Sequence, residues 1–447
     1  MLQDVEKIKP TRRIFGILLL GLFLIMTDIF WKRGLIFLGI LLIFLIPMAK
    51  SYVEISRNIF KKLKVNVSMF GNLEGKEINV VYRLYNPYYM PIFPLELSLK
   101  YPSYFKLIRG SPGGVHLILP KGYLEFKVTL LGRIGEHDIG PLDAIIRDPL
   151  GLFRLKTSLN IKSTIRIYPK VESIRVARLT VQARTVGLSR TKSKGSGIEF
   201  YDVREFQEND ETRYIYWKAL AKYGKLYVKE FEREITLNIM LILDTSKTMF
   251  IGNWGITPVE QGARTFASIA KYASMRDDKI GLTLFSERYM KTSPMRRGKV
   301  ALIDIIRTLS SIKWNSSISG SYDRTSALTN AIKETAKNLS RDRNIIIFFT
   351  APGDKEYINA VTKYMLELKS RGNDTYVILP LTVAYEVTTI TGWQTIIYRL
   401  RSFDKLKNEL LFSSILRSKG VPTIAVGPKD ITQKIISSLE MIRASIG

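Results

Sequence analysis

The sequence has no cysteine and only two histidines among its 447 residues. The missing cysteines exclude disulfide frameworks, thiolate nucleophiles and zinc sites with cysteine ligands. Histidine is the side chain that most often performs acid–base catalysis, so its scarcity argues against an enzyme of that kind. His116 and His137 lie without a serine or carboxylate spacing that suggests a triad or a zinc site. We therefore interpret both as structural and predict a protein that is not an enzyme.

Acidic residues are also few, 40 against 68 basic ones, which gives a formal net charge of +28. Such an excess attracts anionic lipid headgroups or nucleic acid, but no RNA-binding or helix-turn-helix signature organises it. The charge is densest at residues 7–13, 50–64, 184–194 and 296–299. Membrane proximity explains the first two stretches. Binding of an anionic polymer through the last two is the alternative, with nucleic acid the less favoured partner.

Two apolar runs lie near the N-terminus, at residues 14–27 and 34–48, with a short charged connection between them. Each run is roughly 20 Å long as a helix, which suffices for a ~30 Å hydrocarbon layer only if flanking aromatic residues lie in the interface. The short connection predicts an antiparallel transmembrane hairpin, in which Asp28 pairs with Lys32. No small-x-small cleavage site follows the first run, which argues against a signal peptide.

Basic residues flank this hairpin unevenly. Four precede the first run: Lys7, Lys9, Arg12 and Arg13. Five follow the second: Lys50, Arg57, Lys61, Lys62 and Lys64. Only Lys32 and Arg33 lie between the runs. The positive-inside rule then places both ends of the hairpin on the cytoplasmic side. We expect a two-pass membrane protein whose soluble domains are cytoplasmic and whose basic linker contacts an anionic membrane surface.

After this linker, residues 62–170 contain short runs that alternate apolar and polar residues, with turn residues at about ten-residue intervals. This pattern is typical of an immunoglobulin-like β-sandwich, which is more often a spacer or binding module than an active site. In the turn Asp148-Pro149-Leu150-Gly151, the aspartate can accept hydrogen bonds from the following backbone and the proline fixes φ. We interpret this turn as structural.

Apolar runs alternate with amphipathic helical patterns in residues 236–447, which predicts a doubly wound α/β domain. The run at 237–244 ends at Asp244, and Ser246 and Thr248 follow at alternate positions. Open α/β sheets bind ligands at the carboxyl ends of their strands, and oxygen donors of this kind suit Mg²⁺. Asp244, Ser246 and Thr248 are therefore candidate metal ligands. A polar strand near 289–292 is expected as an antiparallel edge.

The order of strand, Asp244-x-Ser246-x-Thr248, helix, strand and hairpin resembles a von Willebrand factor A domain, whose metal-ion-dependent adhesion site begins with Asp-x-Ser-x-Ser. That family adds a threonine before a later helix and an aspartate after the fourth strand. Here Tyr322 and Ala351 stand at those places. Three nearby residues are possible substitutes: Ser321, Thr325 and Asp354. Either the site binds Mg²⁺ weakly, or it is vestigial and its hydroxyls cap the next loop.

A longer signature covers residues 195–234, from Gly195 to Glu234. It resembles domain-of-unknown-function family 58, and the Asp148–Phe153 segment is a second feature of that family. The resemblance implies this domain architecture and a partnership with AAA+ ATPases of the MoxR type in the assembly or maturation of other complexes. It implies no known reaction. A metal-dependent hydrolase is the least favoured function, because one carboxylate without a nearby histidine provides too few groups to bind a metal and activate a water molecule.

Within the signature, charged residues either form a docking surface for a partner or an ordinary solvated ion-pair surface. The candidates are Arg204, Glu205, Asp210, Arg213 and Lys218. We expect Asp210 to cap a short helix and Trp217 to be buried as its anchor. The full prediction is a membrane-anchored scaffold with six parts: 1–13 basic tail, 14–50 hairpin, 51–61 basic linker, 62–170 β-sandwich, 171–235 signature segment and 236–447 von Willebrand factor A-like domain.

Overall fold

The computed structural model describes residues 7–31, 34–159, 161–172, 194–207, 210–232, 236–314, 323–387, 394–428 and 431–446. The chain divides into two compact units, Met1–Tyr168 and Pro169–Gly447. The first contains a helical hairpin and a β domain. The second contains the signature segment and an α/β domain.

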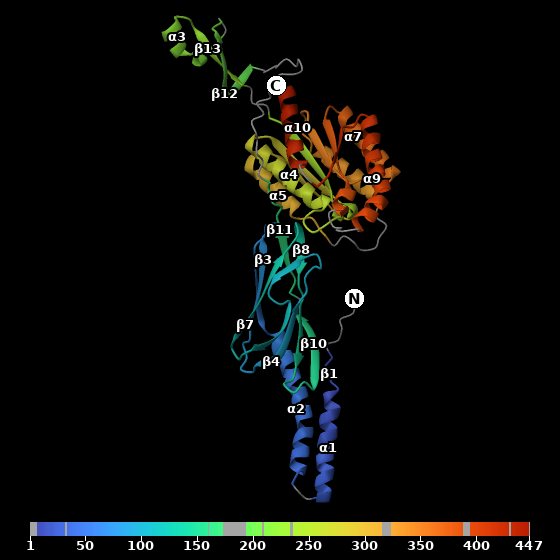
Figure 1. Ribbon diagram of the computed structural model, residues 1–447. Coiled ribbons are helices and arrows are strands. Elements are labelled where there is room, and N and C mark those ends of the chain that lie inside the picture. The colour runs from blue at the N-terminus through green and yellow to red at the C-terminus, as the bar shows by residue number, and fades with distance from the viewer. Residues whose placement is uncertain are drawn as a thin grey trace. The chain divides into compact units, whose positions relative to one another are not determined.

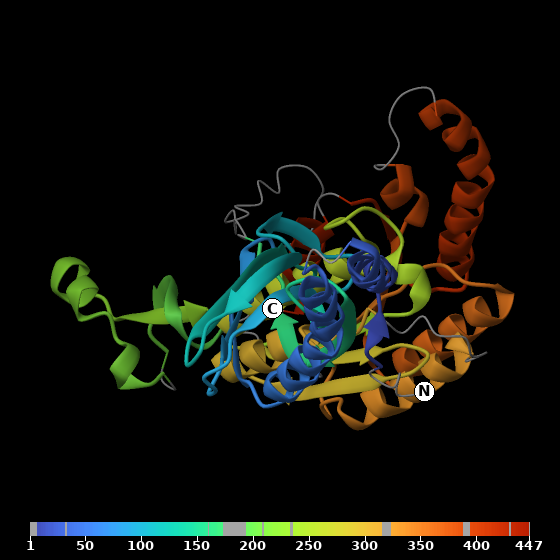
Figure 2. The same ribbon diagram turned by 90° about the horizontal axis from the view of Figure 1, so that it is seen from below.

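Two helices form the hairpin, α1 (Arg13–Trp31) and α2 (Ile36–Lys61), which lie side by side in both views (Figure 1 and Figure 2). The two helices approach most closely where Gly21 faces Gly39. A Cβ atom added to Gly39 would lie only 2.6 Å from the carbonyl oxygen of Gly21, so there is no space for a side chain. Small residues of this kind let membrane helices pack backbone to backbone. The Asp28 carboxylate accepts a hydrogen bond from the Leu35 amide at 2.8 Å. Its predicted partner, Lys32, lies outside the described residues.

Helix α2 continues well beyond the apolar run. Residues 51–61, predicted as a basic linker, are its last turns, and Val53 and Phe60 lie buried in the core of the β domain. Lys50 and Lys61 remain exposed. The buried positions follow helical spacing, but the surrounding charges obscure this pattern in the sequence. The hairpin is therefore joined to the β domain by a packed helix.

The β domain is built from eleven described strands, all in antiparallel pairs. Their bounds are β1 (Lys9–Pro10), β2 (Lys64–Phe70), β3 (Glu77–Tyr85), β4 (Ile92–Leu99), β5 (Lys106–Arg109), β6 (Gly113–Ile118), β7 (Tyr123–Leu131), β8 (Gly135–Ile139), β9 (Leu142–Arg147), β10 (Phe153–Leu159) and β11 (Ser163–Ile167). The sheet orders are β1-β10-β9-β4-β6, β2-β3-β7-β5 and β11-β8. Both larger sheets contribute to one apolar core. The immunoglobulin-like assignment of this domain stays a prediction.

The turn at Asp148 is structural, as the sequence predicts. Its carboxylate accepts hydrogen bonds from the amides of Leu150 at 3.0 Å and Phe153 at 2.6 Å. The Thr11 hydroxyl donates to the Gly151 carbonyl at 2.7 Å, and the Thr11 amide donates to the Leu152 carbonyl at 2.7 Å. The turn thus fixes the chain just before α1 begins.

The α/β domain contains one sheet in the order β16-β15-β14-β17-β18-β19. Its strands are β14 (Asn238–Asp244), β15 (Lys279–Phe285), β16 (Met290–Arg296), β17 (Ile345–Phe349), β18 (Asp374–Pro380) and β19 (Thr423–Val426). All neighbours are parallel except β16, which pairs antiparallel with β15 at the edge. The predicted doubly wound domain and its antiparallel edge strand are therefore confirmed.

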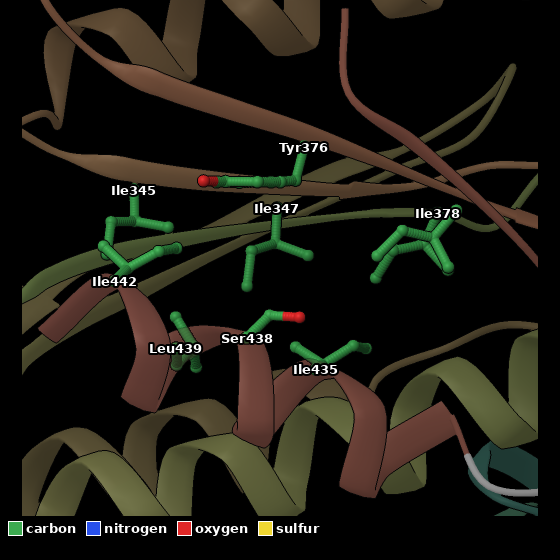
Figure 3. A pocket seen from close by; sticks show the side chains of 9 residues that line it. Ile345, Ile347, Tyr376, Ile378, Ile435, Ser438, Leu439 and Ile442 are labelled. Carbon is green, nitrogen blue, oxygen red and sulfur yellow. The ribbon is translucent and has the colours of Figure 1, made fainter. Parts of the chain in front are cut away.

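Helices cover both faces of this sheet. One core contains α6 (Arg324–Lys337), α7 (Lys355–Ser370) and α9 (Gln394–Ser418). Helix α4 (Pro258–Met275) packs closely on the other face, where a Cβ atom added to Gly262 would lie 2.7 Å from the Leu243 side chain. Helix α4 also contacts α5 (Gly298–Leu309) and α10 (Ile431–Ile446). Between α10 and the sheet lies a cavity of about 20 Å³ lined mainly by isoleucines (Figure 3). An apolar cavity of this size stays dry and suggests no ligand.

The signature segment forms a two-stranded antiparallel ribbon, β12 (Lys194–Glu205) and β13 (Tyr227–Glu232), which flanks a short 3₁₀ turn and α3 (Trp217–Tyr223). The prediction that Trp217 is buried is wrong, because 62% of its surface is exposed. Ile215, Ala219 and Val228 are buried instead. Ile215 has extended backbone and bridges Val228 in β13, whereas Trp217 is the first residue of α3 and lies outside that contact.

Candidate functional site

Strand β14 ends at Asp244, at the carboxyl edge of the sheet. Between Asn238 and Asp244 the strand is apolar and buried, so it delivers this carboxylate into the interior, where the Asp244 side chain is completely buried. Oδ1 of Asp244 accepts a hydrogen bond from the Ser246 amide at 2.8 Å, and the hydroxyls of Ser246 and Thr248 lie 3.1 Å apart. The three predicted oxygen donors therefore lie in one turn. Their role as metal ligands stays a prediction.

The second oxygen of Asp244 is held by residues that the sequence interpretation missed. Nη2 of Arg324 donates to Oδ2 at 2.5 Å, and the Thr350 hydroxyl donates to it at 2.7 Å. The Tyr357 hydroxyl lies 3.4 Å from the same oxygen. Arg324 is the first residue of α6, Thr350 directly follows β17, and Tyr357 lies in the first turn of α7. Three elements thus converge on one carboxylate.

The Arg324 guanidinium is itself bound on several sides. Nη2 also donates to the Ala351 carbonyl at 2.7 Å and the Thr350 hydroxyl at 3.0 Å, and Nη1 donates to the Pro352 carbonyl at 3.2 Å. The guanidinium lies 3.9 Å from the centre of the Tyr357 ring. Burial alone would lower the pKa of Arg324, but the charge of Asp244 outweighs it, so the pKa lies above its usual value. Arg324 is therefore a permanent cation at this edge.

The proposed substitutes for the missing ligands do not complete a metal shell. Asp354 caps α7 by accepting a hydrogen bond from the Tyr357 amide at 2.9 Å. The Thr325 amide donates to Asp323, which caps α6. Ser321 lies outside the described residues. Ala351 is buried and offers only its carbonyl, which Arg324 uses.

The donors present do not fit Mg²⁺. Both oxygens of Asp244 already accept hydrogen bonds, and an arginine contacts the oxygen that a cation would need. Among the described residues, no group of three or more histidine, aspartate or glutamate side chains is arranged to hold a metal ion. A hard cation requires several oxygen ligands, and the positive charge of a neighbouring arginine repels it.

A second buried ion pair lies at the opposite edge of the sheet. Nη2 of Arg443, in α10, donates to Oδ2 of Asp278 at 2.6 Å, and the Leu237 amide donates to Oδ1 at 2.8 Å. Burial raises the pKa of Asp278 above its usual value, although Arg443 opposes this shift. This pair joins α10 to the starts of β14 and β15.

The charged residues of the signature segment divide into two kinds. Arg204 and Asp210 form a double hydrogen bond in which Nη1 donates to Oδ2 at 2.6 Å, and the Gln207 amide donates to Asp210 at 2.7 Å. Asp210 therefore orders its own loop and caps no helix. The other three candidates lie outward: Glu205 pairs with Lys225 at 3.0 Å, Arg213 pairs with Glu211, and Lys218 is exposed. Only these three have the exposure that a docking surface needs.

The two basic stretches at 184–194 and 296–299 give little support for binding of an anionic polymer. Nearly all of the stretch at 184–194 lies outside the described residues. In the stretch at 296–299, Arg296 pairs with Asp304 at 2.8 Å and Arg297 with Asp277 at 3.8 Å. Their charge is partly neutralised within the chain.

The comparisons with known proteins agree with the signature. Residues 202–351 match the family described as "Protein of unknown function DUF58". No curated protein matches the chain. Two similar solved structures are the VWA domain of SpRpn10 (10% identity, 46% of this chain and 95% of that chain, TM-score 0.25) and the conserved hypothetical protein BatB from Bacteroides thetaiotaomicron (14%, 47% and 100%, 0.31). Residues 202–351, about a third of the chain, are therefore similar to the DUF58 family, and they include most of the signature at 195–234.

Proposed function

We propose that this protein is a membrane-anchored, non-enzymatic scaffold that presents its A-type domain to protein partners. The observation that carries the proposal is the hairpin. Its two helices are long and apolar enough to cross a membrane, and side chains such as Leu19, Phe23 and Phe44 are exposed along them. An apolar surface of this extent needs a lipid or protein cover. Because α2 also packs into the β domain, the anchor holds that domain directly.

In the proposed orientation, the soluble domains lie on the cytoplasmic side of the membrane. Arg12, Arg13 and Lys50 lie at the end of the hairpin next to the β domain, and all three are exposed. Phe30 and Trp31 lie at the other end and are also exposed, which suits an aromatic belt at the opposite interface. This distribution supports the positive-inside assignment. In this arrangement the β domain, predicted as immunoglobulin-like, is a spacer.

The internal bonding at Asp244 supports a role without catalysis. A general base must be able to accept a proton from a substrate, whereas this carboxylate is buried and occupied by Arg324 and Thr350. The same bonding opposes the metal-dependent hydrolase. The polar edge of the sheet instead resembles a rigid structural junction between β14, α6 and α7.

The proposed partner is a MoxR-type AAA+ ATPase, as the family resemblance implies. The surface that we assign to it is the outer side of the signature segment, where Trp217, Lys218 and Tyr223 are exposed. Tryptophan and tyrosine are enriched among the few residues that carry most of the binding energy at protein interfaces. The outward charges at Glu205 and Arg213 would steer the encounter rather than hold the complex.

The absence of cysteine makes the membrane topology testable by single-cysteine labelling. We would introduce Phe30→Cys at the hairpin end or Lys76→Cys in the β domain, and add a membrane-impermeant maleimide to sealed cells. Both positions are exposed. We expect labelling of Phe30→Cys in intact cells and of Lys76→Cys only after permeabilisation. Labelling of Lys76→Cys in intact cells would contradict the cytoplasmic placement.

A further inference from the structure

We propose that Arg324 replaces the divalent cation of the A-type site, so that this domain keeps a complete strand-end site without any metal. The inference concerns the chemistry of the site and does not depend on membrane anchoring. It rests on the position of one guanidinium among groups that a metal would otherwise bring together.

The position of Arg324 is the first argument. Its Nη2 atom contacts the Asp244 carboxylate, the Thr350 hydroxyl and the Ala351 carbonyl within 3.0 Å. These groups come from the ends of β14 and β17, the two strands whose carboxyl ends flank an A-type metal. One nitrogen therefore gathers three oxygens from the ends of two strands, which is the structural role of a bound cation.

The balance of charge is the second argument. Asp244 is fully buried, and an isolated buried carboxylate is strongly unfavourable. The family compensates this charge with a metal, whereas here a positive side chain of the same chain does so at 2.5 Å. A divalent ion would have to displace that side chain, and the chain has Ala351 where a second carboxylate would help to hold it.

The anchoring of Arg324 is the third argument. Asp323 fixes the start of α6 by accepting hydrogen bonds from the amides of Thr325 and Ser326, and the Tyr357 ring lies against the guanidinium. The side chain is thus held on two sides by neighbouring elements. A guanidinium prepared in this way neutralises Asp244 at little further cost in side-chain entropy.

The test uses the full chain in detergent, with Mn²⁺ as the probe. Millimolar Mn²⁺ should leave the melting temperature of the parent unchanged, relative to EDTA. Arg324→Ala should lower it by roughly 10 °C, because it leaves a buried charge without a partner. Mn²⁺ should then restore part of that loss, since Asp244 and the hydroxyls of Ser246 and Thr350 become available. The double variant Asp244→Asn with Arg324→Ala should recover stability and lose the response to Mn²⁺.

Arg443→Ala is the matched control. It also removes the partner of a buried aspartate, Asp278. Among the described residues, that carboxylate accepts hydrogen bonds from Arg443 and the Leu237 amide and from no hydroxyl, so Mn²⁺ should not rescue this variant. Binding of Mn²⁺ to the parent, measured by its paramagnetic signal and abolished by Asp244→Asn, would overturn the proposal. So would an Arg324→Ala variant as stable as the parent. The binding measurement on the parent decides the matter even if the variants fail to fold.

Discussion

At the scale of single residues, a buried carboxylate requires a positive charge and several hydrogen-bond donors, because removing it from water costs several kcal/mol. Asp244 has both, from Arg324, Thr350 and the Ser246 amide. The sequence places Asp244 correctly at a strand end, since the apolar run before it is unambiguous. It gives no sign of Arg324, because an arginine at the start of a helix is normally solvated and only the folded arrangement turns it inward.

The hydroxyl of Thr350 should contribute measurably to this arrangement. Thr350→Val keeps the shape but removes a donor to Asp244, so we expect a loss of about 1–3 kcal/mol in the free energy of unfolding. Thr375→Val is the matched control, because the Thr375 hydroxyl is buried without a hydrogen-bond partner among the described residues. That change should be neutral or stabilising. Denaturant titration of both variants gives the comparison, and equal losses would contradict the role assigned to Thr350.

His137 should make the β domain sensitive to acid. Its side chain is buried, its Nε2 lies 2.6 Å from the Arg133 carbonyl, and burial lowers its pKa to about 4. The unfolded chain, with a histidine pKa near 6.5, binds the proton more tightly. Stability should therefore be full above pH 6.5 and fall as the pH decreases toward 4, by on the order of 3 kcal/mol.

Hydrogen exchange of the β8 amides between pH 7 and pH 4 measures this loss. His137→Gln removes the titrating group, so the pH dependence of the exchange free energy should flatten in that variant. An unchanged slope would show that other groups cause the acid sensitivity.

At the scale of elements, the helical hairpin depends on its two glycines. Gly39→Leu should separate α1 from α2, because no space exists for a side chain beside the Gly21 carbonyl. Gly16→Leu, on α1, is the matched control, since a Cβ atom there meets nothing within 4 Å. Faster hydrogen exchange along both helices in detergent is expected for Gly39→Leu only. Similar exchange in the two variants would mean that the close contact does not hold the hairpin together.

Elements with strong periodicity were predictable, and those held by single contacts were not. The run at 237–244 contains β14 and the polar stretch near 289–292 overlaps β16, because apolar and alternating patterns determine burial in a sheet. The last turns of α2 were missed, since charges interrupt their apolar positions. Trp217 was assigned to the interior because of its size, but Ile215 and Val228 fill that space.

At the scale of the whole molecule, the chain combines a helical hairpin, a β domain, a ribbon with an exposed aromatic surface and an α/β domain. Composition and periodicity change from one part to the next, which is why the sequence can be divided into parts at all. It could not indicate which charges lie inward. Arg204 and Asp210 were grouped with the outward residues, whereas their double hydrogen bond orders the ribbon itself. Charge reversal at Arg204 or Asp210 should therefore disturb folding of the ribbon as well as partner binding.

The central claim is that this protein is a scaffold whose signature segment holds an ATPase partner. The direct measurement is affinity purification of the full chain from native membranes, with quantification of co-purified MoxR-type ATPase by mass spectrometry. Parent and Trp217→Ala are compared, with Tyr89→Ala in the β domain as the control for loss of an exposed aromatic residue. We predict ATPase recovery with the parent and Tyr89→Ala, and a loss of tenfold or more with Trp217→Ala at unchanged thermal stability. Absence of the ATPase from the parent sample, or equal recovery with all three proteins, would contradict the account.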